Sequence, residues 1–336
     1  MARYPFDKSL RLKYLQHRAK YRKICRIAEK ESRRTLTKAL TEVGKDDPKK
    51  FWSIMNKMNK WGKDKDNPAN EISPGSWKKH FENHLNGEGT KETTCGHVAT
   101  LSTFDPSLDG RVTKNEIDEA LRKMTPGKAP GPDGILTEYL KAFNTICVDI
   151  LLKLMRTLFS NHTYPSTWRL NFLKPIHKKG DVKDPHNYRG LAIASSLAKL
   201  HGQILLKRLK KYIEEKKIIS HNQIGFMEGS RTSDHIFLLQ TIAEKVVKKC
   251  RKKLFCVFVD FQKAYDLVDR NKLLQKLKVL GINGIFYRNI TAMYAKTEYS
   301  VKISNGSLKP ITSNLGLRQG CLLSPLLCNI YIDDIK

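Results

Sequence analysis

The stretch Leu254-Phe-Cys-Val-Phe-Val-Asp260 places six apolar residues directly before a carboxylate. An uninterrupted apolar run of this length predicts a strand that is buried on both faces of a sheet. Such a strand would present Asp260 at its end, ahead of Phe261-Gln-Lys-Ala-Tyr-Asp266. Carboxylate oxygens suit Mg²⁺, which takes one or two carboxylates together with substrate phosphates. The alternative is that Asp260 caps the next helix, and the stretch alone leaves both interpretations open.

A second informative stretch, Gly316-Leu-Arg-Gln-Gly-Cys-Leu-Leu-Ser-Pro325, lies further along the chain. Gly316 and Gly320 would allow the backbone to approach a ligand closely. Ser324 and Pro325 predict the N-cap and the first-turn proline of the next helix. Taken alone, this stretch is explained by an ordinary loop that starts a helix.

Upstream, residues 112–160 predict two helices joined by a rigid turn. Thr113 and Glu116 have the spacing of a capping box, and the apolar residues after them recur at helical spacing. The turn, Gly127-Lys-Ala-Pro-Gly-Pro-Asp-Gly134, combines prolines that restrict the backbone with glycines that permit close approach. It is not a P-loop, because no Gly-Lys-Ser/Thr follows a spaced glycine. A second helix is expected over residues 135–160.

The middle of the chain predicts a β-hairpin. An apolar stretch over 172–177 and another from Leu191 flank a polar loop over 178–187, with basic residues at the tip and flank. Helices alternate with strands through the rest of the chain, which indicates an α/β or α+β domain.

The charge of the chain is strongly positive. It contains 62 Lys or Arg against 33 Asp or Glu, for a formal net charge of +29, and residues 1–60 contain 18 basic against 6 acidic residues. Such an excess favours a polyanionic partner, because a Lys or Arg on a phosphate releases a condensed counterion. An anionic membrane surface is the rival partner. For residues 1–60, which look helical, a solvated helix face and an arm for RNA or DNA are equally open.

Other features narrow the class of protein. We find no apolar run long enough to span a bilayer, and no short apolar stretch behind the basic N-terminus to act as a signal peptide. The seven cysteines are odd in number and include no CxxC pair, which predicts neither a disulfide framework nor a zinc site. Reduced thiols in the nucleus or the cytoplasm fit best. Residues 62–75 indicate a linker, and a short amphipathic helix is expected around Trp77, Phe81 and Leu85.

Five segments in a fixed order resemble the reverse transcriptases of non-LTR retrotransposons of the long interspersed, jockey-like and RTE-like kinds. They are GKAPGPDGI at 127–135, NYRGLAIASSLAKL at 187–200 preceded by IHKKGD from 176, QIGFMEGSRTSDHI at 223–236, FVDFQKAYDLVDR at 258–270 and GLRQGCLLSPLLCNIYI at 316–332. Each segment is a weak signal alone, whereas the ordered set is specific. The resemblance covers roughly residues 112–336. In addition, Lys49-Lys-Phe-Trp52 is similar to the region that joins endonuclease to polymerase in such proteins.

The resemblance implies an α+β fold, in which a basic helical N-terminal segment precedes the fingers and part of the palm of a right-hand polymerase. The expected divisions are a basic helical segment at 1–61, a linker with a short helix at 62–111, an N-terminal extension of the polymerase at 112–153, and the reverse transcriptase domain at 154–336.

The resemblance also implies the catalytic and metal-binding residues. Asp260 would be catalytic and would bind both metals, with the carbonyl of Phe261 as a further ligand. Two Mg²⁺ ions would stabilise the attacking and leaving oxygens of an in-line phosphoryl transfer. Asp266 and Asp269 are expected to cap or pair on the helix that follows the strand.

The nucleotide-binding residues implied by the resemblance lie on three segments. Tyr265 would exclude a ribose 2′-OH, and a buried aromatic role is compatible with that function. Lys178 and Arg189 would hold the incoming triphosphate, since Arg offers a fork to phosphate oxygens and Lys a point charge. Gln319 and Gly320 would line the nucleotide and template side.

The string Tyr331-Ile-Asp-Asp334 has the letters of the Asp-Asp hairpin that this family needs as its second carboxylate site. Its apolar spacing after Ser324-Pro325 is helical, so we expect a helix there instead. We therefore expect this chain to lack the Asp-Asp hairpin, the rest of the palm, the thumb and the upstream endonuclease, and to be inactive alone.

The function implied by the resemblance is RNA-directed DNA polymerase, which transfers nucleotides to a primer 3′-OH. Its partners would be an RNA template, a DNA primer and deoxynucleoside triphosphates. One alternative is a non-catalytic basic nucleic-acid-binding protein derived from such an element. Another is the polymerase domain of a group II intron or telomerase relative, although GKAPGPDGI followed by NYRG favours the retrotransposon type. No feature of the sequence indicates an oligomeric state.

Overall fold

The structure is a computed structural model that describes scattered positions between 16 and 39, residues 68–86, and residues 103–334 apart from 221, 228, 304 and 305. The chain forms two compact units, Met1–Asn67 and Pro68–Lys336. In the first unit the described positions are helical. The segment Lys49-Lys-Phe-Trp52 lies outside the described residues, and the domain boundaries expected from the sequence stay predictions.

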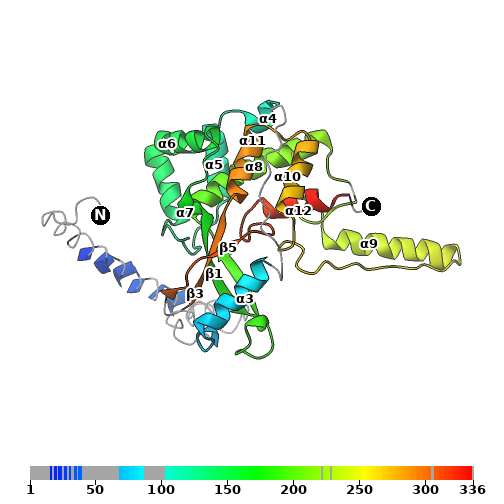
Figure 1. The fold of residues 1–336 in the computed structure, drawn as a ribbon, viewed down its shortest axis with the longest axis horizontal. Coiled ribbons are helices and arrows are strands. Elements are labelled where there is room, and N and C mark those ends of the chain that lie inside the picture. The colour runs from blue at the N-terminus through cyan, green and yellow to red at the C-terminus, as the bar shows by residue number, and fades with distance from the viewer. Residues whose placement is uncertain are drawn as a thin grey trace. The chain divides into compact units, whose positions relative to one another are not determined.

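The second unit is an α+β structure that contains a mixed five-stranded sheet (Figure 1). In this sheet β1 lies between β2, which is antiparallel to it, and β3, which is parallel to it, while β4 and β5 pair with β3 in antiparallel fashion. The expected hairpin is confirmed, with a register that runs from Phe172 opposite Ile193 to His177 opposite Tyr188. The strands are β1 (Leu170–His177), β2 (Tyr188–Ile193), β3 (Thr297–Ile303), β4 (Gly306–Ser307) and β5 (Ile311–Ser313).

A small apolar core joins this sheet to α3 (Pro74–Asn86). The expected amphipathic helix is confirmed, because its three large apolar residues, Trp77, Phe81 and Leu85, are all buried. Trp77 packs edge-on against Tyr188 of β2, with ring centroids 5.0 Å apart. The Trp77 indole also donates to the carbonyl of Ala69, at 3.0 Å, so its polar atom is satisfied inside the core. The cluster fixes α3 on the hairpin strands.

A larger apolar core lies among the helices above the sheet in Figure 1. The predicted capping box is confirmed, since the Thr113 amide donates to Glu116 (2.9 Å) and the Glu116 amide donates to Thr113 Oγ1 (3.3 Å). The second predicted helix is also confirmed. The helices of this region are α4 (Pro106–Asp109), α5 (Lys114–Lys123), α6 (Thr137–Ser160), α7 (Ser166–Arg169), α8 (Ser196–Lys216), α10 (Arg270–Val279), α11 (Ile285–Tyr294) and α12 (Ser324–Ile332).

The rigid turn over 127–134 is seated against the start of α8. The Ser195 hydroxyl donates to the Asp133 carboxylate, and the Ser196 hydroxyl donates to the carbonyl of Ile135, at 2.7 Å. A side chain at Gly131 would lie 2.5 Å from the backbone nitrogen of Ser195. Glycine is therefore required here for close approach of two backbones, as the sequence suggested for this turn.

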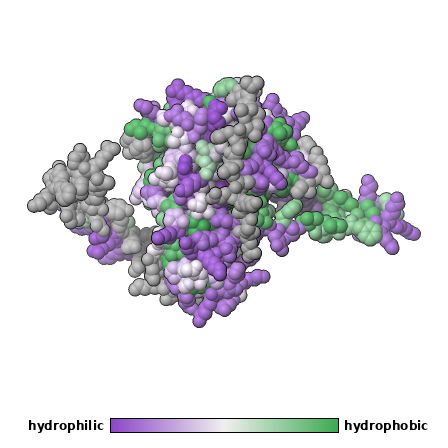
Figure 2. Space-filling view, viewed as in Figure 1, coloured by the Kyte–Doolittle hydropathy of each residue, from purple (hydrophilic) through white to green (hydrophobic). Residues whose placement is uncertain are grey.

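An arm formed by α9 (Thr232–Ala243) and the following π-helical turn (Glu244–Lys249) projects from the rest of this unit (Figure 1). No residue of α9 is buried, and Figure 2 shows apolar side chains along the arm. None of the helices in the described part of the chain is long and apolar enough to cross a membrane.

The predicted buried strand over Leu254–Asp260 is wrong. This stretch forms no strand, and Phe255 and Val257 are 86% and 88% exposed. A strand that is apolar on both faces needs backbone partners and cover on each face. Among the described residues, the strands of the sheet pair only with one another and not with this stretch. The next regular element after it in the chain is the helix α10. The apolar run consequently lies in irregular backbone, with most of its side chains exposed.

Candidate functional site

The turn over residues 263–268 and the loop over 314–322 bind each other through their backbones. The amide of Gly316 donates to the carbonyl of Val268 at 3.0 Å, and the amide of Leu317 donates to the carbonyl of Tyr265 at 2.7 Å. Gly316 has φ +76°, and a side chain there would lie 2.5 Å from the carbonyl oxygen of Asp266. This contact therefore depends on glycine at position 316, both for its backbone conformation and for its lack of a side chain.

The side chains of the same two segments also meet. Gln319 Nε2 donates to Asp266 Oδ1 at 2.7 Å, and His84 Nε2 of α3 lies 3.3 Å from Asp266 Oδ2. Burial acts to raise the pKa of Asp266, but the hydrogen bonds from His84 and Gln319 outweigh it and hold that pKa below its ordinary value. The carboxylate is therefore ionised at neutral pH, and each of its oxygens accepts one of these hydrogen bonds.

Two buried arginines hold the loop in place through hydrogen bonds. Arg270, the first residue of α10, donates to the carbonyls of Ser313 and Gly316, each at 2.8 Å. Arg318 donates to the carbonyl of Trp168 at 2.8 Å, and its guanidinium lies 4.8 Å from the centroid of the Tyr164 ring. Each planar guanidinium group donates hydrogen bonds to backbone carbonyls in a fixed geometry, and these bonds make the loop rigid.

The loop also contacts the sheet. The amide of Gln319 donates to the hydroxyl of Tyr299 on β3 at 2.9 Å, and burial raises the pKa of Tyr299 to about 12, so this hydroxyl stays neutral. A side chain at Gly320, whose φ is +79°, would lie 3.0 Å from the carbonyl oxygen of Ala192 on β2. The loop thus lies between the hairpin and the 263–268 turn.

A narrow slot of about 20 Å³ opens beside this loop. Its polar lining includes Asn171, Lys199, Gln319 and the backbone around Gly320. Burial and the nearby charge of Lys128 lower the pKa of Lys199, against the attraction of Asp133. Much of the remaining lining is apolar and includes Ala194, Met293 and Leu322, so the slot is a largely apolar recess with a few polar side chains.

The structure brings together three of the residues selected from the sequence. Tyr265, Gln319 and Gly320 lie on the two joined segments. Tyr265 is half-buried, packs against the main core, and meets the ring of Phe226 edge-on at 6.2 Å between centroids. Tyr265 is thus a partly buried aromatic at the margin of the core, and the nucleotide-binding roles of all three residues stay predictions.

The two predicted triphosphate-binding cations lie on the hairpin. Lys178 follows β1 and Arg189 is on β2, on the face opposite Tyr188, and both are exposed. The hydrogen bonds and ion pairs recorded for the described residues do not join either side chain to Gln319. Their exposure leaves both charges accessible to an anion.

Asp260 and Phe261 lie in an exposed, irregular stretch rather than at the end of a sheet strand. Within the described part of the chain, no three His, Cys, Asp or Glu side chains gather closely enough to hold a metal ion. Asp260 therefore offers Mg²⁺ a single carboxylate beside the carbonyl of Phe261. These residues do not form a complete metal site by themselves.

Several smaller predictions can be compared with the structure. Asp269 is the N-cap of α10, accepting from the amides of Asn271 and Lys272, and Asp266 is paired, both as expected. Ser324 was expected to be the N-cap of α12 and is not, because it is already the first helical residue and its hydroxyl donates to the carbonyl of Arg318 at 2.8 Å. The helix expected over Tyr331-Ile-Asp-Asp334 is confirmed as far as Ile332.

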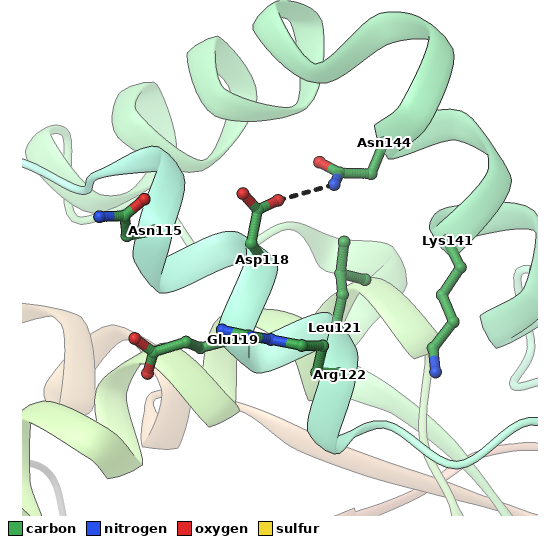
Figure 3. A pocket seen from close by; sticks show the side chains of 7 residues that line it. All are labelled: Asn115, Asp118, Glu119, Leu121, Arg122, Lys141 and Asn144. Carbon is green, nitrogen blue, oxygen red and sulfur yellow. Dashed lines mark hydrogen bonds between the residues drawn. The ribbon is translucent and has the colours of Figure 1, made fainter.

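A separate hollow of about 570 Å³ lies between α5 and α6 (Figure 3). The Asp118 carboxylate accepts from the Asn144 amide at 2.8 Å across it. Arg122 and Lys141 share its lining with Asp118 and Glu119, so the lining contains charges of both signs. This mixed lining does not favour a polyanion, and the hollow is not part of the site built on Gln319.

Sequence patterns did not reveal His84, Tyr299 or Lys199. His84 lies 182 positions before Asp266 in the chain, and Tyr299 is one apolar position of a strand. No local spacing connects such residues. A partial signal existed for Arg318, since a charged residue between Leu317 and Gln319 in a glycine-bounded loop needs a specific partner if it is buried.

A family model described as Reverse transcriptase (RNA-dependent DNA polymerase) matches residues 176–336. The chain is 27% identical over 266 residues to a protein named probable RNA-directed DNA polymerase from transposon BS of Drosophila melanogaster, covering 76% of this chain and 29% of that protein. It is 27% identical over 238 residues to the RNA-directed DNA polymerase from mobile element jockey of Drosophila funebris, covering 67% and 24%.

A third relative is the retrovirus-related Pol polyprotein from type-1 retrotransposable element R2 of Popillia japonica, 29% identical over 225 residues, covering 67% of this chain and 30% of that protein. The chain thus spans less than a third of the length of each of these relatives. The resemblance to non-LTR retrotransposon polymerases drawn from the five motifs is confirmed by these matches.

Proposed function

We propose that this chain, whose residues 176–336 belong to the reverse transcriptase (RNA-dependent DNA polymerase) family, supplies the fingers and part of the palm of a non-LTR retrotransposon polymerase. The reaction would be template-directed transfer of deoxynucleotides to a primer 3′-OH on an RNA template. Reduced cysteines favour action in the nucleus or the cytoplasm.

One observation carries the proposal to specific residues. The 263–268 turn, which bears Tyr265, is joined to the Gly316–Cys321 loop by two backbone hydrogen bonds and by the Gln319–Asp266 contact. Gly320 then places the same loop against β2 of the hairpin. We infer that a nucleotide bound where these segments meet would contact both Tyr265 and Gln319.

The charge of the chain supports a nucleic-acid partner. The net charge of +29 favours contacts to phosphates, which give affinity with little sequence preference. Lys178 and Arg189 are the exposed hairpin cations that we propose for the triphosphate. We also propose Mg²⁺ as the cofactor. Asp260 and the Phe261 carbonyl would supply some of its ligands, and substrate phosphates would supply others.

Primer extension on an RNA template tests the proposal, with this chain beside a version continued through the downstream reading frame. We expect DNA synthesis by the continued version, and its loss with Asp260→Asn. Tyr265→Ala should admit ribonucleotides, whereas Tyr265→Phe, which keeps the ring, should not. Synthesis that survives Asp260→Asn, or unchanged sugar discrimination in Tyr265→Ala, contradicts the assigned roles.

A second candidate is a non-catalytic nucleic-acid-binding protein. It is favoured by the position of Asp260 on an exposed stretch outside the sheet. Both candidates predict that log affinity for RNA falls linearly with log salt, with a slope of about −0.7 per phosphate contact on single strands. Only the second predicts that no version of the chain extends a primer, and a flat salt dependence contradicts both.

A further inference from the structure

The amide of Gln319 has one atom committed and one available. Its Nε2 donates to Asp266 Oδ1 at 2.7 Å. An ionised carboxylate only accepts hydrogen bonds, so the amide nitrogen must face it and the opposite orientation is excluded. Within the described residues no hydrogen bond is formed to Gln319 Oε1. Since Gln319 lines the slot beside Gly320, Oε1 is the atom left for a ligand.

Asp266 is itself fixed from the other side. Its Oδ2 faces His84 Nε2 of α3 at 3.3 Å, and its side chain is only 15% exposed. The end of α3 is in turn bound to the start of the loop, because Asn86 donates to the carbonyl of Thr312 and accepts from the amide of Asn314, each at 3.0 Å. The series of contacts from His84 through Asp266 to Gln319 therefore connects α3 to the slot and restricts the rotation of these side chains.

We propose that Asp266 is a positioning residue: held by His84, it orients the Gln319 amide so that Oε1 is presented to the slot as a hydrogen-bond acceptor. The inference rests on the proposed function only in taking the ligand to be a nucleotide or its template. It adds the polarity of recognition. Oε1 repels phosphate oxygens, which are also acceptors, and it favours a donor such as a sugar hydroxyl or a base N–H.

This assignment separates two kinds of binding within one site. The phosphates of the ligand would be held by cations, whereas Gln319 would read an uncharged donor. Loss of Asp266 would free the Gln319 amide to rotate, because the terminal torsion of Gln has a broad, roughly two-fold profile. Recognition of the donor would then weaken while phosphate binding persisted.

Side-chain amide NMR tests the orientation without requiring activity. In the ¹⁵N-labelled full chain, the Gln319 Nε2 proton pair is assigned by its disappearance in Gln319→Glu. We expect one of its protons to be shifted downfield and protected from exchange with water. Asp266→Ala and the nearly isosteric Asp266→Asn should move the pair, and His84→Ala should do so partly. His84→Gln keeps a hydrogen-bond donor near Asp266, so it should restore the wild-type position of the Gln319 amide signals.

A binding series tests the polarity. The probes are a deoxynucleoside triphosphate, an abasic deoxyribose triphosphate and tripolyphosphate, each with template–primer present. Asp266→Ala should weaken the first about tenfold, as expected for one hydrogen bond, and leave tripolyphosphate unchanged. An equal loss for the abasic probe identifies a sugar hydroxyl as the donor, and loss for the nucleoside probe alone identifies the base. The matched control is Asp149→Ala, an exposed carboxylate on α6.

The outcomes separate the inference from the proposed function. A Gln319 amide pair that is unchanged in Asp266→Ala overturns the inference, and so does an equal loss of tripolyphosphate affinity. If the wild-type chain binds none of the probes but the amide pair responds as expected, Asp266 still positions Gln319 and the nucleotide-binding function is what fails.

Discussion

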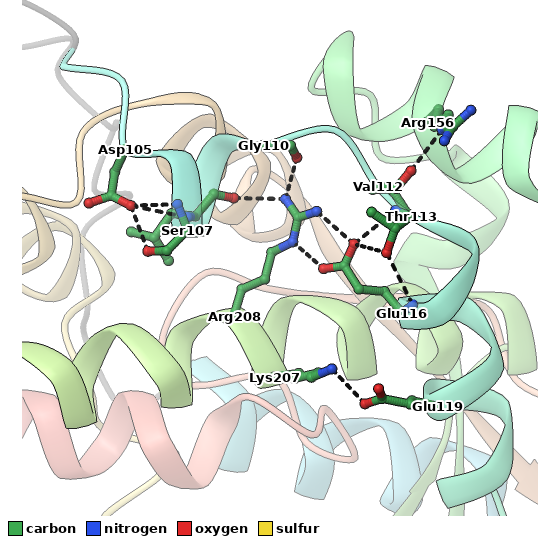
Figure 4. A network of polar contacts seen from close by, with 11 residues as sticks. Asp105, Ser107, Gly110, Val112, Thr113, Glu116, Glu119, Arg156, Lys207 and Arg208 are labelled. Atoms are coloured by element: carbon green, nitrogen blue, oxygen red, sulfur yellow. Dashed lines mark hydrogen bonds and ion pairs between the residues drawn. The ribbon is translucent and has the colours of Figure 1, made fainter.

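The guanidinium of Arg208 on α8 binds the carboxylate of Glu116 on α5 through two hydrogen bonds, Nε to Oε1 at 2.6 Å and Nη2 to Oε2 at 2.9 Å (Figure 4). Its third nitrogen donates to the carbonyls of Leu108 and Gly110, at 2.8 and 2.7 Å. Burial acts to raise the pKa of Glu116, but the hydrogen bonds from Arg208 and Thr113 hold it below its ordinary value. One arginine therefore connects α8 to α5 and to the segment before it.

Replacing this arginine should destabilise the fold strongly. The Arg208 and Glu116 side chains are 6% and 15% exposed, so Arg208→Met would leave a buried carboxylate without its partner. We expect a loss of about 3–5 kcal/mol in the free energy of unfolding, measured in urea. Arg208→Lys should recover little of it, because an ammonium cannot reproduce the two-pronged contact.

A neighbouring pair supplies the control. Lys207 and Glu119 join the same two helices at 2.5 Å, but their side chains are 44% and 36% exposed (Figure 4). Lys207→Met should hardly change the stability, since solvent screens an exposed pair. Similar losses of stability for Lys207→Met and Arg208→Met would show that burial does not determine the cost of losing the ion pair.

A buried histidine should make the stability depend on pH. His201 of α8 is 3% exposed, and its ring lies against those of Tyr164 and Trp168. Burial lowers its pKa to about 4, from an ordinary value of 6.5. Above 6.5 neither the folded nor the unfolded chain protonates this ring. Between 6.5 and 4 the unfolded chain takes up the proton first, so stability falls as the pH falls through this window.

The loss attributable to His201 is on the order of 3 kcal/mol between pH 7 and pH 4, at about 1.4 kcal/mol for each tenfold difference in proton affinity. His201→Phe should show a correspondingly smaller loss when urea unfolding is compared at pH 7 and pH 4.5. His80, whose pKa is also lowered to about 4 by burial and by His186 and His84, should account for part of the remainder. An identical pH dependence in wild type and His201→Phe would contradict this assignment.

Local features of this fold were predictable from the sequence because their causes are local. The capping box at Thr113, the N-cap at Asp269 and the β1–β2 hairpin each follow from spacings of a few residues. The motif order also identified the segments that carry Tyr265 and Gln319. These predictions needed no knowledge of the tertiary contacts.

Other features depend on partners that no local pattern names. Leu254–Asp260 has the composition of a buried strand, but burial requires neighbouring strands and cover, which the described residues do not provide. The Asp266–Gln319 contact joins positions 53 residues apart, and the His84–Asp266 contact joins segments further apart still. Only the fold brings these polar groups together, so their pairing was not predictable.

Two glycines of the 127–134 turn should respond differently to substitution. Gly131→Ala would place its Cβ within 2.5–2.7 Å of the backbone of Ala194 and Ser195, so the turn must move away from α8. Gly134 has open space but φ +71°, so its cost is conformational, about 1 kcal/mol for a side chain in the left-handed region. Asn tolerates this region better than Val.

Thermal unfolding of three variants checks the distinction. We expect Gly131→Ala to lower the unfolding temperature more than Gly134→Asn does. Gly134→Val should also lower it more than Gly134→Asn. Exposure of the turn to limited proteolysis should increase only for Gly131→Ala. If Gly131→Ala unfolds like wild type, the close approach of the turn to α8 is not a constraint.

The exposed apolar run before Asp260 should cause the chain to associate with itself. Phe255, Val257 and Phe258 are 86%, 88% and 84% exposed, and the backbone around them belongs to no described strand. An exposed segment of β-branched and aromatic residues outside any described strand can pair with another chain, as edge strands do. Val257→Lys should reduce this association, because a charge in the middle of such a segment opposes pairing.

Sedimentation velocity over a concentration series measures the effect, with Val279→Lys as the control. Val279 at the end of α10 is equally exposed, at 86%, but it is a single apolar residue on a helix. We expect Val257→Lys to shift the chain toward monomer and Val279→Lys to behave as wild type; equal effects of the two variants would attribute the change to net charge and not to the apolar run.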